Sequence, residues 1–256
     1  MNVLQRTRNQ AARGLTLIEL VVVLAILVAL VGLVLAFFPG LLGRASSSTS
    51  ASSAQDIARA AQINYTTTLS YGTDYDSLLN AASGNTIYNS IPAPALAQLT
   101  PHTLTQDDVD ALARLGINSV RHLNTVTGDA TFNVSAATST PLISGGSVAS
   151  VSTINGATVQ TALRGNVVAG ANPVYVVFGV NKFASIVGVG RLLQDAPVRA
   201  GASATENPST SYQRYGLAFL VDGTGAARTA RFLGAVSFTA TGIATAEGNL
   251  QQYYSN

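Results

Sequence analysis

Residues 13–44 read RGLTLIELVVVLAILVALVGLVLAFFPGLLGR, and this stretch decides how the chain is organised. Every residue from Leu20 through Gly43 is uncharged, and most are Val, Leu, Ala or Ile. An α-helix rises about 1.5 Å per residue, so about 20 apolar residues cross a hydrocarbon layer of about 30 Å. The run therefore predicts a transmembrane helix. It is longer than the apolar core of an ordinary secretory signal peptide, and no small-residue cleavage site follows it.

The charges that flank the apolar run predict its orientation. The first fourteen residues contain three arginines and no acidic residue: Arg6, Arg8 and Arg13. Arg44 alone follows it closely. Because positive residues beside a membrane helix stay in the cytoplasm, we expect a single-pass protein of the inner (cytoplasmic) membrane with a cytoplasmic N-terminus. The residues after Arg44 would then form a periplasmic or extracellular head.

Glu19 interrupts the apolar pattern near the start of the run. A carboxylate at the centre of a bilayer costs about 2.5–3.5 kcal/mol, and less near the headgroups, which an ordinary flanking charge would reach. Its neighbours favour another interpretation, because the segment RGLTLIEL (residues 13–20) resembles the N-terminal signal of type IV prepilins and pseudopilins. The resemblance covers residues 13–38: a basic leader, a glycine, an apolar-Thr-Leu-Ile-Glu-Leu motif and a long apolar helix.

The resemblance implies a processing and assembly pathway. The prepilin peptidase/methyltransferase would cut between Gly14 and Leu15 and methylate the new amine of Leu15, which stands where the family usually has Phe. Glu19 would be the glutamate required for assembly. The implied partners are this enzyme, other pilin or pseudopilin subunits in a homo- or hetero-filament, the assembly platform of the inner membrane, and membrane lipid. The protein would move from the membrane into a pilus or pseudopilus.

The chemistry of these residues fits the implied roles. Gly14 gives a protease close access to the backbone. After cleavage, Leu15 carries a cationic amine about 6 Å along the helix axis before Glu19. A carboxylate inside a membrane is tolerated best beside a cation, so Glu19 of one subunit can pair with the amine of a neighbour in a staggered bundle. Because no such amine exists before cleavage, proteolysis would gate assembly.

The end of the apolar helix departs from the family pattern. Many members have a helix-kinking proline near position 36, whereas this chain has Ala36 and Pro39. Proline lacks a backbone donor and clashes with the preceding turn, which predicts a helix kink at Pro39 or the end of the helix there. Residues 46–53, SSSTSASS, are typical of a linker, or they continue the helix. The family architecture and an apolar stripe at helical spacing favour the helix: Ala54, Ile57, Ala58, Ala61, Tyr65 and Leu69.

The composition of the 256 residues excludes several classes of protein. Hydrophobic residues make up 47% and charged residues 10%, which excludes a charge-rich disordered chain or a coiled coil. Without cysteine there is no disulfide or thiolate site, and two histidines argue against a multi-histidine metal centre. The net charge is +2 and the pI about 9.0, yet basic and acidic residues are equal in number from Arg44 onward. The basic pI is therefore a topology signal, and no nucleic-acid partner is evident.

Local signals predict a short helix near residues 105–115. Thr105 suits the N-cap, aspartates crowd the first turn, Arg114 lies in the last turn and Gly116 follows it. We interpret the aspartates as partners of the helix dipole rather than cation ligands. Three prolines predict a loop over residues 85–101. Residues 126–165 are rich in Ser, Thr, Gly and Val, which predicts short strands and loops whose order the sequence does not indicate.

Two hairpins are predicted in the C-terminal third. The first joins two strands through Asn181-Lys182: Val174–Val180 and Phe183–Val189. The second joins two strands through the turn at residues 222–225: Tyr215–Val221 and Arg228–Thr239. Some secretion pseudopilins bind calcium through C-terminal loop residues, but Asp222-Gly223 lacks the alternating acidic ligands of a calcium loop, so we interpret it as a tight turn. The hairpins predict an antiparallel sheet of about four strands.

The sequence gives little support to an enzyme. His102 and His122 are the candidates for a general base near neutral pH, and neither has a serine or acidic partner at a known motif spacing. We expect no cofactor, no metal and no catalytic residue. A membrane-anchored enzyme is the weaker alternative, and a binding protein is a further one.

These observations predict an α+β, pilin-like protein with a long N-terminal transmembrane helix and a globular head that contains an antiparallel β-sheet. Four segments are expected: a cleaved leader (1–14), a transmembrane and assembly helix (15–43), an amphipathic continuation with its exit loop (44–80) and the head (81–256). The expected function is that of a structural subunit of a type IV pilus or type II secretion-like pseudopilus. The alternative is a membrane-anchored extracytoplasmic binding protein, a minor or tip pilin for adhesion or DNA uptake, without a major filament role.

Overall fold

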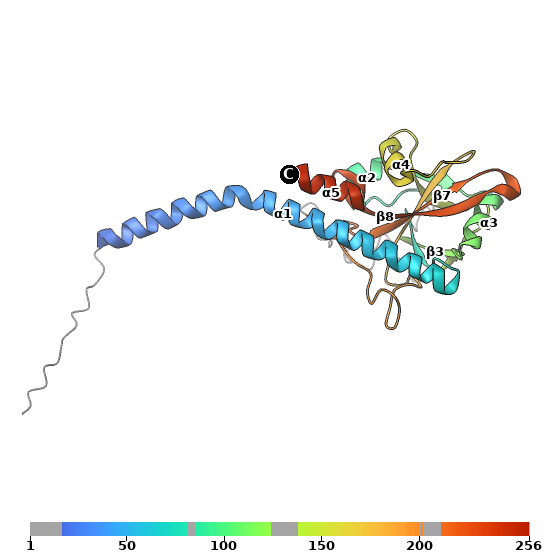
Figure 1. Ribbon diagram of the computed structural model, residues 1–256, viewed down its shortest axis with the longest axis horizontal. Helices are drawn as coiled ribbons and strands as arrows, with labels where there is room; N and C mark the ends of the chain where they lie inside the picture. Colours follow the sequence, from blue (N-terminus) through green and yellow to red (C-terminus); the bar gives the residue numbers. More distant parts are fainter. Residues whose placement is uncertain (1–16, 81–84, 124–137, 200, 202–210, 256) are drawn as a thin grey trace, which may run out of the picture. The chain divides into compact units, whose positions relative to one another are not determined.

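The computed structural model describes residues 17–80, 85–123, 138–199, 201 and 211–255 (Figure 1). The chain separates into two compact units, one ending at Leu41 and the other beginning at Leu42. The first unit contains an apolar helical segment, and the second is a head rich in β-strands. The prediction of an α+β protein with an N-terminal apolar helix is thereby confirmed.

Helix α1 (Leu17–Thr68) is assigned without interruption and belongs to both units. It therefore does not end at Pro39, and the polar residues 46–53 are helical rather than a linker. The kink at Pro39 stays a prediction. The chain leaves the helix at Leu69, whose φ of 56° is left-handed, so the helical geometry stops there.

Among the described residues, the head is built on one nine-stranded sheet. Its strands are β1 (Tyr75–Asn80), β2 (Leu99–Thr103), β3 (Ser119–Leu123), β4 (Thr140–Pro141), β5 (Ser147–Val151), β6 (Val174–Gly179), β7 (Tyr215–Asp222), β8 (Thr229–Thr239) and β9 (Gly242–Thr245). Its helices are α2 (Ala93–Ala97), α3 (Gln106–Arg114), α4 (Ala157–Arg164), α5 (Ala246–Ser255) and the 3₁₀ turn η2 (Gly225–Ala227).

The sheet is mixed and forked. Its main path runs β4-β3-β1-β6-β7-β8-β9, and β5 also pairs with β6 and carries β2 at its other edge. Strands β1 and β3 are parallel, and the remaining pairs are antiparallel. The prediction of a purely antiparallel sheet of about four strands is therefore wrong: the sheet has more strands, and one pair of them is parallel. The parallel pair arises because the chain crosses through α2, β2 and α3 before β3 returns beside β1.

Two apolar layers cover the two faces of the central strands. Alternate residues point to opposite faces, so Phe178 and Phe219 enter one layer while Tyr175 and Leu220 enter the other. Residues of α1 and α3 cover the first face, and residues of α2 and α4 cover the second. Helices α2 and α4 both contact β9, and Figure 1 shows their positions in the head. The head is thus a helix–sheet–helix sandwich.

The half of α1 within the head packs through small side chains. Ser47, Ser50, Ala54, Ile57 and Ala61 are buried along one stripe of the helix. Small residues let a helix approach a sheet closely, and the hydroxyl of Tyr215 donates to Ser50 Oγ at 3.3 Å. Buried hydroxyls need such partners. The predicted stripe is confirmed from Ala54 to Tyr65. The prediction that Leu69 belongs to it is wrong, because Leu69 lies beyond the helix and is 74% exposed.

The second predicted hairpin and the predicted helix are confirmed. β7 and β8 pair across the 222–229 turn. Helix α3 begins at Thr105, whose side chain accepts from the Asp108 amide while the Asp108 carboxylate accepts from the Thr105 amide, a capping box. Gly116 follows the helix with a φ of 77°. Both features depend on residues near one another in sequence, which is why the sequence predicts them.

The first predicted hairpin is wrong. β6 pairs with β7 instead of with Phe183–Val189, which contains turns and no strand. The Asn181 side chain accepts hydrogen bonds from the amides of Phe183 (2.6 Å) and Ala184 (2.9 Å), and these contacts turn the chain out of the sheet. The loop predicted over 85–101 contains α2 and the start of β2, and the stretch 126–165 contains α4, whereas residues 124–137 lie outside the described chain.

The packing of α1 on the sheet is tested by a matched pair of isoleucines in the same helix. Ile57 is 1% exposed and Ile63 is 42% exposed. We expect Ile57→Ala to lower the free energy of unfolding of the head by about 2–5 kcal/mol, because it leaves a cavity, and Ile63→Ala to change it by less than about 0.5 kcal/mol. Denaturant unfolding of the full chain in detergent, followed by circular dichroism, measures both. Equal effects would contradict the described packing.

Candidate functional site

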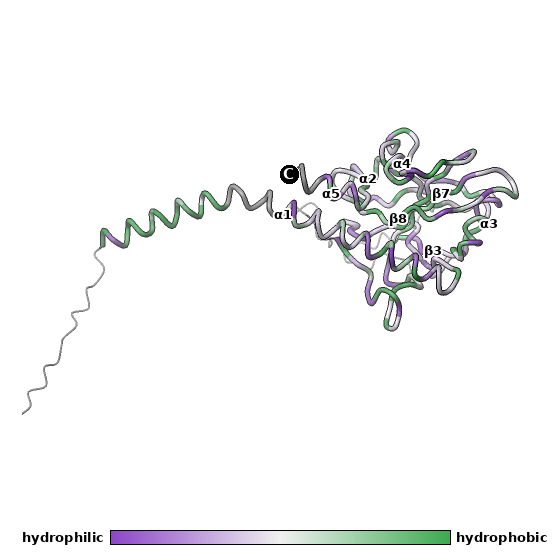
Figure 2. Tube along the Cα trace, in the orientation of Figure 1, coloured by the Kyte–Doolittle hydropathy of each residue, from purple (hydrophilic) through white to green (hydrophobic). Residues whose placement is uncertain are grey.

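The apolar half of α1 is the first candidate site. Residues Leu17–Val34 have a mean hydropathy of 3.2, and all of these side chains are exposed within the chain itself. Figure 2 shows this half of α1 as hydrophobic along its length. By length and composition, it is the one helix among the described residues that can cross a membrane. A helix that is apolar on all sides needs a non-aqueous environment or packed neighbours.

The predicted processing residues stand at the start of this helix. Gly14 and Leu15 lie outside the described residues. Glu19 is in the first turn of α1 and its side chain is exposed. Because the N-terminus of a helix carries a partial positive charge, this position favours a carboxylate. The structure thus places Glu19 at the N-terminal end of the apolar segment.

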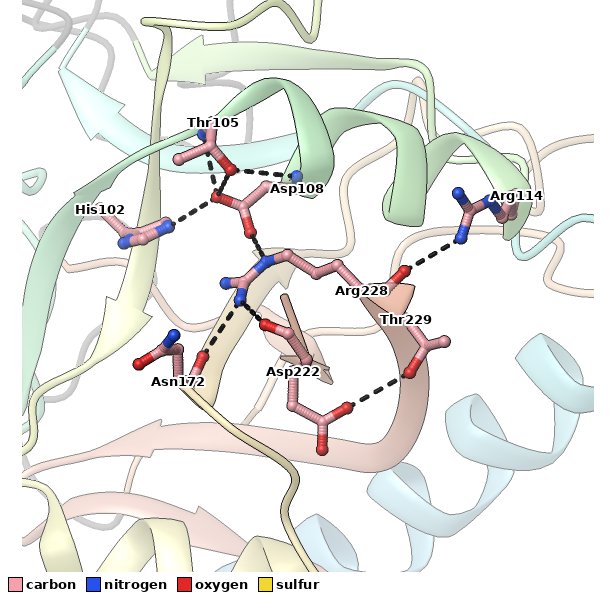
Figure 3. Close-up of polar contacts among 9 residues, drawn as sticks. His102, Thr105, Asp108, Arg114, Asn172, Asp222, Arg228 and Thr229 are labelled. Atoms are coloured by element: carbon pink, nitrogen blue, oxygen red, sulfur yellow. Dashed lines mark hydrogen bonds and ion pairs between the residues drawn. The ribbon is translucent and has the colours of Figure 1, made fainter. Parts of the chain in front are cut away.

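A second polar cluster lies in the head around Asp108 (Figure 3). Asp108 is 1% exposed, and its Oδ2 accepts from the Thr105 amide at 2.9 Å and the Thr105 hydroxyl at 2.8 Å. His102 Nε2 lies 3.2 Å from the same oxygen. Arg228 Nε donates to Oδ1 and forms a buried ion pair. Beyond its predicted role as a partner of the helix dipole, Asp108 binds Arg228.

The surroundings of Asp108 stabilise its ionised form. Burial opposes ionisation, but the hydrogen bonds from Thr105, Arg228 and His102 outweigh it and lower the pKa of the Asp108 carboxyl below its ordinary value. Arg228 also donates to the carbonyl of Gly223 at 2.8 Å and to that of Asn172 at 3.3 Å. The cluster therefore joins α3 to the β7–β8 turn and acts as a structural clamp.

A third cluster surrounds Asp76 on β1. Its Oδ2 accepts from the Tyr212 hydroxyl at 2.8 Å and from Arg214 Nη1 at 3.1 Å, and its Oδ1 accepts from Asn181 at 2.7 Å. All four side chains are buried. Burial, followed by the negative charge of Asp76, raises the pKa of Tyr212 well above its ordinary value, so this phenol stays neutral and donates. Gly179 is required here, because a Cβ would lie 1.8 Å from the Tyr212 hydroxyl.

The Asp222-Gly223 turn uses its carboxylate within the fold. Asp222 Oδ2 accepts from the amide of Gly170 at 2.6 Å and pairs with Arg231, and Oδ1 accepts from the Thr229 hydroxyl at 3.3 Å. Asp222 is buried, and Gly223 has a φ of 102°, as a tight turn requires. Among the described residues, no group of three or more His, Asp or Glu side chains is placed to hold a metal ion.

The structure gives both histidines partners that their sequence spacing does not indicate. His102 contacts Asp108, and His122 Nδ1 lies 3.0 Å from Ser77 Oγ across the parallel β1–β3 pair. Burial lowers the pKa of His122, which keeps the ring neutral and able to accept the hydroxyl proton. Ser77 is fully buried, and its oxygen also accepts from the Leu79 amide. A serine nucleophile must reach its substrate, so this geometry serves the packing of the sheet.

An open groove of about 700 Å³ lies beside the edge strand β9. Every residue that lines it is uncharged: Gln98, Thr158, Val159, Ala162, Thr241, Ile243, Ala244, Thr245, Gly248 and Gln251. The side chain of Gln98 accepts from the Ile243 amide at 2.7 Å and thereby covers part of the strand edge. The groove offers amide and hydroxyl groups for hydrogen bonding and no acid–base pair.

Comparison with protein-family models, curated proteins and solved structures finds no match to this chain. The class of the protein therefore has to be argued from its own residues. The structure establishes an N-terminal apolar helix of membrane-spanning length followed by an α+β head with a mixed sheet.

The clamp around Asp108 predicts a pH-dependent contribution to stability. At neutral pH we expect Asp108→Asn to lower the free energy of unfolding by about 3–5 kcal/mol, because it leaves Arg228 buried without its charged partner. A carboxyl whose pKa is lowered by folding stabilises the protein above its unfolded pKa of about 3.9, and this contribution is lost as the pH falls through the folded value. The difference between wild type and variant should therefore shrink below about pH 4.

Asp110→Asn is the matched control, since Asp110 lies on the exposed side of the same helix. Denaturant unfolding at a series of pH values measures both variants. A difference for Asp108→Asn that stayed constant down to acid pH would contradict the clamp.

Proposed function

We propose that the chain is a structural, non-catalytic subunit of a type IV pilus or a type II secretion-like pseudopilus. The observation that supports this most strongly is the uncovered apolar half of α1, with Glu19 in its first turn and the segment RGLTLIEL at its start. The same helix continues into the head and packs there on the sheet. One helix thus provides a membrane anchor and a surface for other copies, and its second half is part of the head.

The proposed pathway begins in the inner membrane. The arginines before the helix keep the N-terminus in the cytoplasm, and the head is on the periplasmic or extracellular side. Prepilin peptidase cuts after Gly14 and methylates the amine of Leu15. That amine then pairs with Glu19 of a neighbouring subunit while the apolar helices exchange lipid for one another on the assembly platform.

A second candidate is a minor or tip subunit that binds a ligand for adhesion or DNA uptake. The groove beside β9 favours the adhesion form of this candidate, because a volume of about 700 Å³ lined by amides, hydroxyls and small apolar side chains suits an uncharged ligand. Immunogold labelling of sheared filaments separates the candidates. Label along the whole filament supports the major subunit, and label confined to one end supports the second candidate.

Processing is tested at the proposed cleavage site. We expect Gly14→Val to block cleavage, because a branched side chain next to the scissile bond obstructs the protease. The uncleaved precursor should accumulate on immunoblots, and mass spectrometry should find no methylated N-terminus at Leu15. Gly32→Val is the control, since a Cβ at Gly32 meets nothing within 4 Å. Normal cleavage of Gly14→Val would contradict the proposal.

Assembly is tested at the proposed pairing residue. We expect Glu19→Gln to be cleaved and methylated normally but to fall at least about tenfold in the sheared-filament fraction, because the amide keeps the shape and removes the charge. Glu247→Gln is the control, as Glu247 is an exposed glutamate in the first turn of α5. Filament levels of Glu19→Gln equal to those of the control would reject this assembly mechanism.

A further inference from the structure

Residues 186–193, called here the 186–193 loop, expose apolar side chains on the head. Val189 is 96% exposed, more than any other large apolar side chain in the described chain, and Leu192 is 43% exposed. Phe183 lies just before the loop and is also exposed. Three apolar side chains close together in sequence at a protein surface indicate a contact surface rather than chance exposure.

The backbone of the loop fixes this exposure. The Gly188 amide donates to the Leu193 carbonyl at 2.8 Å, the Leu193 amide to the Ile186 carbonyl at 3.1 Å, and the Arg191 amide to the Gly188 carbonyl at 3.0 Å. Gly188 and Gly190, on either side of Val189, have φ values of 132° and 76°, which favour glycine. Ile186 and Val187 are buried at the base of the loop. Val189 therefore stands at the apex of a closed turn.

The buried Asp76 cluster holds the segment that leads into the loop. Asn181 is fully buried, donates to Asp76 and accepts from the amides of Phe183 and Ala184. The position of Phe183 is thus fixed by hydrogen bonds inside the head. A surface whose position is fixed in this way loses little conformational freedom when it binds.

Two cations lie over the Phe183 ring, and one of them, Arg121, is mostly buried and also pairs with Asp74 at 3.8 Å. The guanidinium of Arg121 lies 4.5 Å, and the amine of Lys182 5.0 Å, from the centre of the Phe183 ring. Arg191 is exposed within the loop. From Asn181 through Gln194 there is no acidic residue, and the next one is Asp195. The surface therefore combines exposed apolar groups with positive charge.

The loop lies at the C-terminal end of α1. The Ser185 amide donates to the Thr73 carbonyl at 3.0 Å, and the Thr73 amide donates to Ser185 Oγ at 2.8 Å, so the base of the loop adjoins the chain just after the helix. Arg44 and Thr68 are separated by about 36 Å along the helix axis. Within the head, the loop is therefore remote from the residue that follows the apolar run.

We propose that the 186–193 loop binds the surface of an anionic phospholipid bilayer, and that this is a second bilayer rather than the one that holds the apolar half of α1. Val189 and Leu192 enter the headgroup layer, where exposed apolar side chains leave water. Lys182 and Arg191 contact lipid phosphates, because basic residues near such a surface are attracted to its negative potential. A partner that combines an apolar interior with an anionic surface matches both properties of the loop.

Vesicle tethering by the full chain tests the proposal. The protein is reconstituted into phosphatidylcholine vesicles and mixed with labelled acceptor vesicles of pure phosphatidylcholine or with about 30 mol% phosphatidylserine. We expect at least about tenfold more capture of the anionic acceptors, and less capture as added salt screens the charges. Equal capture of both acceptors would overturn the proposal. Clustering of the protein-bearing vesicles without acceptors would also overturn it and indicate contact between copies of the chain.

Two variants separate the apolar and the charged contributions. Val189→Ser with Leu192→Ser, and separately Lys182→Gln with Arg191→Gln, should each reduce capture of anionic vesicles at least about tenfold. Ile154→Ser is the control, because Ile154 is a single exposed apolar residue elsewhere on the head. If the double serine variant fails to fold, the variant with Lys182→Gln and Arg191→Gln still tests the proposal. Unchanged capture by a folded variant of either kind would overturn the proposal, and neither result depends on filament assembly through Glu19.

Discussion

Helix α1 has to satisfy two different environments within one uninterrupted run of residues. From Leu17 to Val34 its side chains, apart from Glu19, are apolar and uncovered, so this half needs lipid or packed helices around it. From Ser47 onward one stripe of mostly small residues is buried against the sheet, and most of the other positions are polar. The head can bind this second half closely because the stripe is built mainly from serine and alanine. The serine-rich segment is tolerated in a helix because tertiary packing, more than propensity, stabilises helices.

The charges of the head are placed inside it to an unusual degree. Three buried aspartates each bind an arginine from another segment: Asp76 with Arg214, Asp108 with Arg228, and Asp222 with Arg231. Isolated buried charges are costly, so each pair constrains which segments pack together. The equal numbers of basic and acidic residues in the head thus reflect internal pairing as well as low surface charge. A weakly charged surface limits repulsion between closely packed copies, as a filament subunit requires.

Features that depend on neighbouring residues could be predicted from the sequence. The capping box of Thr105 and Asp108 and the β7–β8 turn each lie within a short segment, and both were predicted where they occur. The parallel β1–β3 pair joins segments about 45 residues apart, as the Ser77–His122 contact illustrates, and the sequence contains no local signal for it. The partner of β6 was predicted wrongly for the same reason, because alternating apolar residues indicate burial and not the identity of the neighbouring strand.

The N-terminal processing signal and the 186–193 loop differ in how far the sequence alone could predict them. A protease reads its signal in linear order, so Gly14, Leu15 and Glu19 can be proposed without a fold. The 186–193 loop could not be proposed in this way, because its alternating valines and glycines are typical of a strand and predict burial. The Asn181 side chain accepts from two amides and turns the chain out of the sheet, and the backbone hydrogen bonds and positive-φ glycines of the loop then expose Val189. In this loop the sequence pattern predicts burial, but the structure shows an exposed turn. Such disagreements between sequence pattern and fold are expected mainly at functional sites.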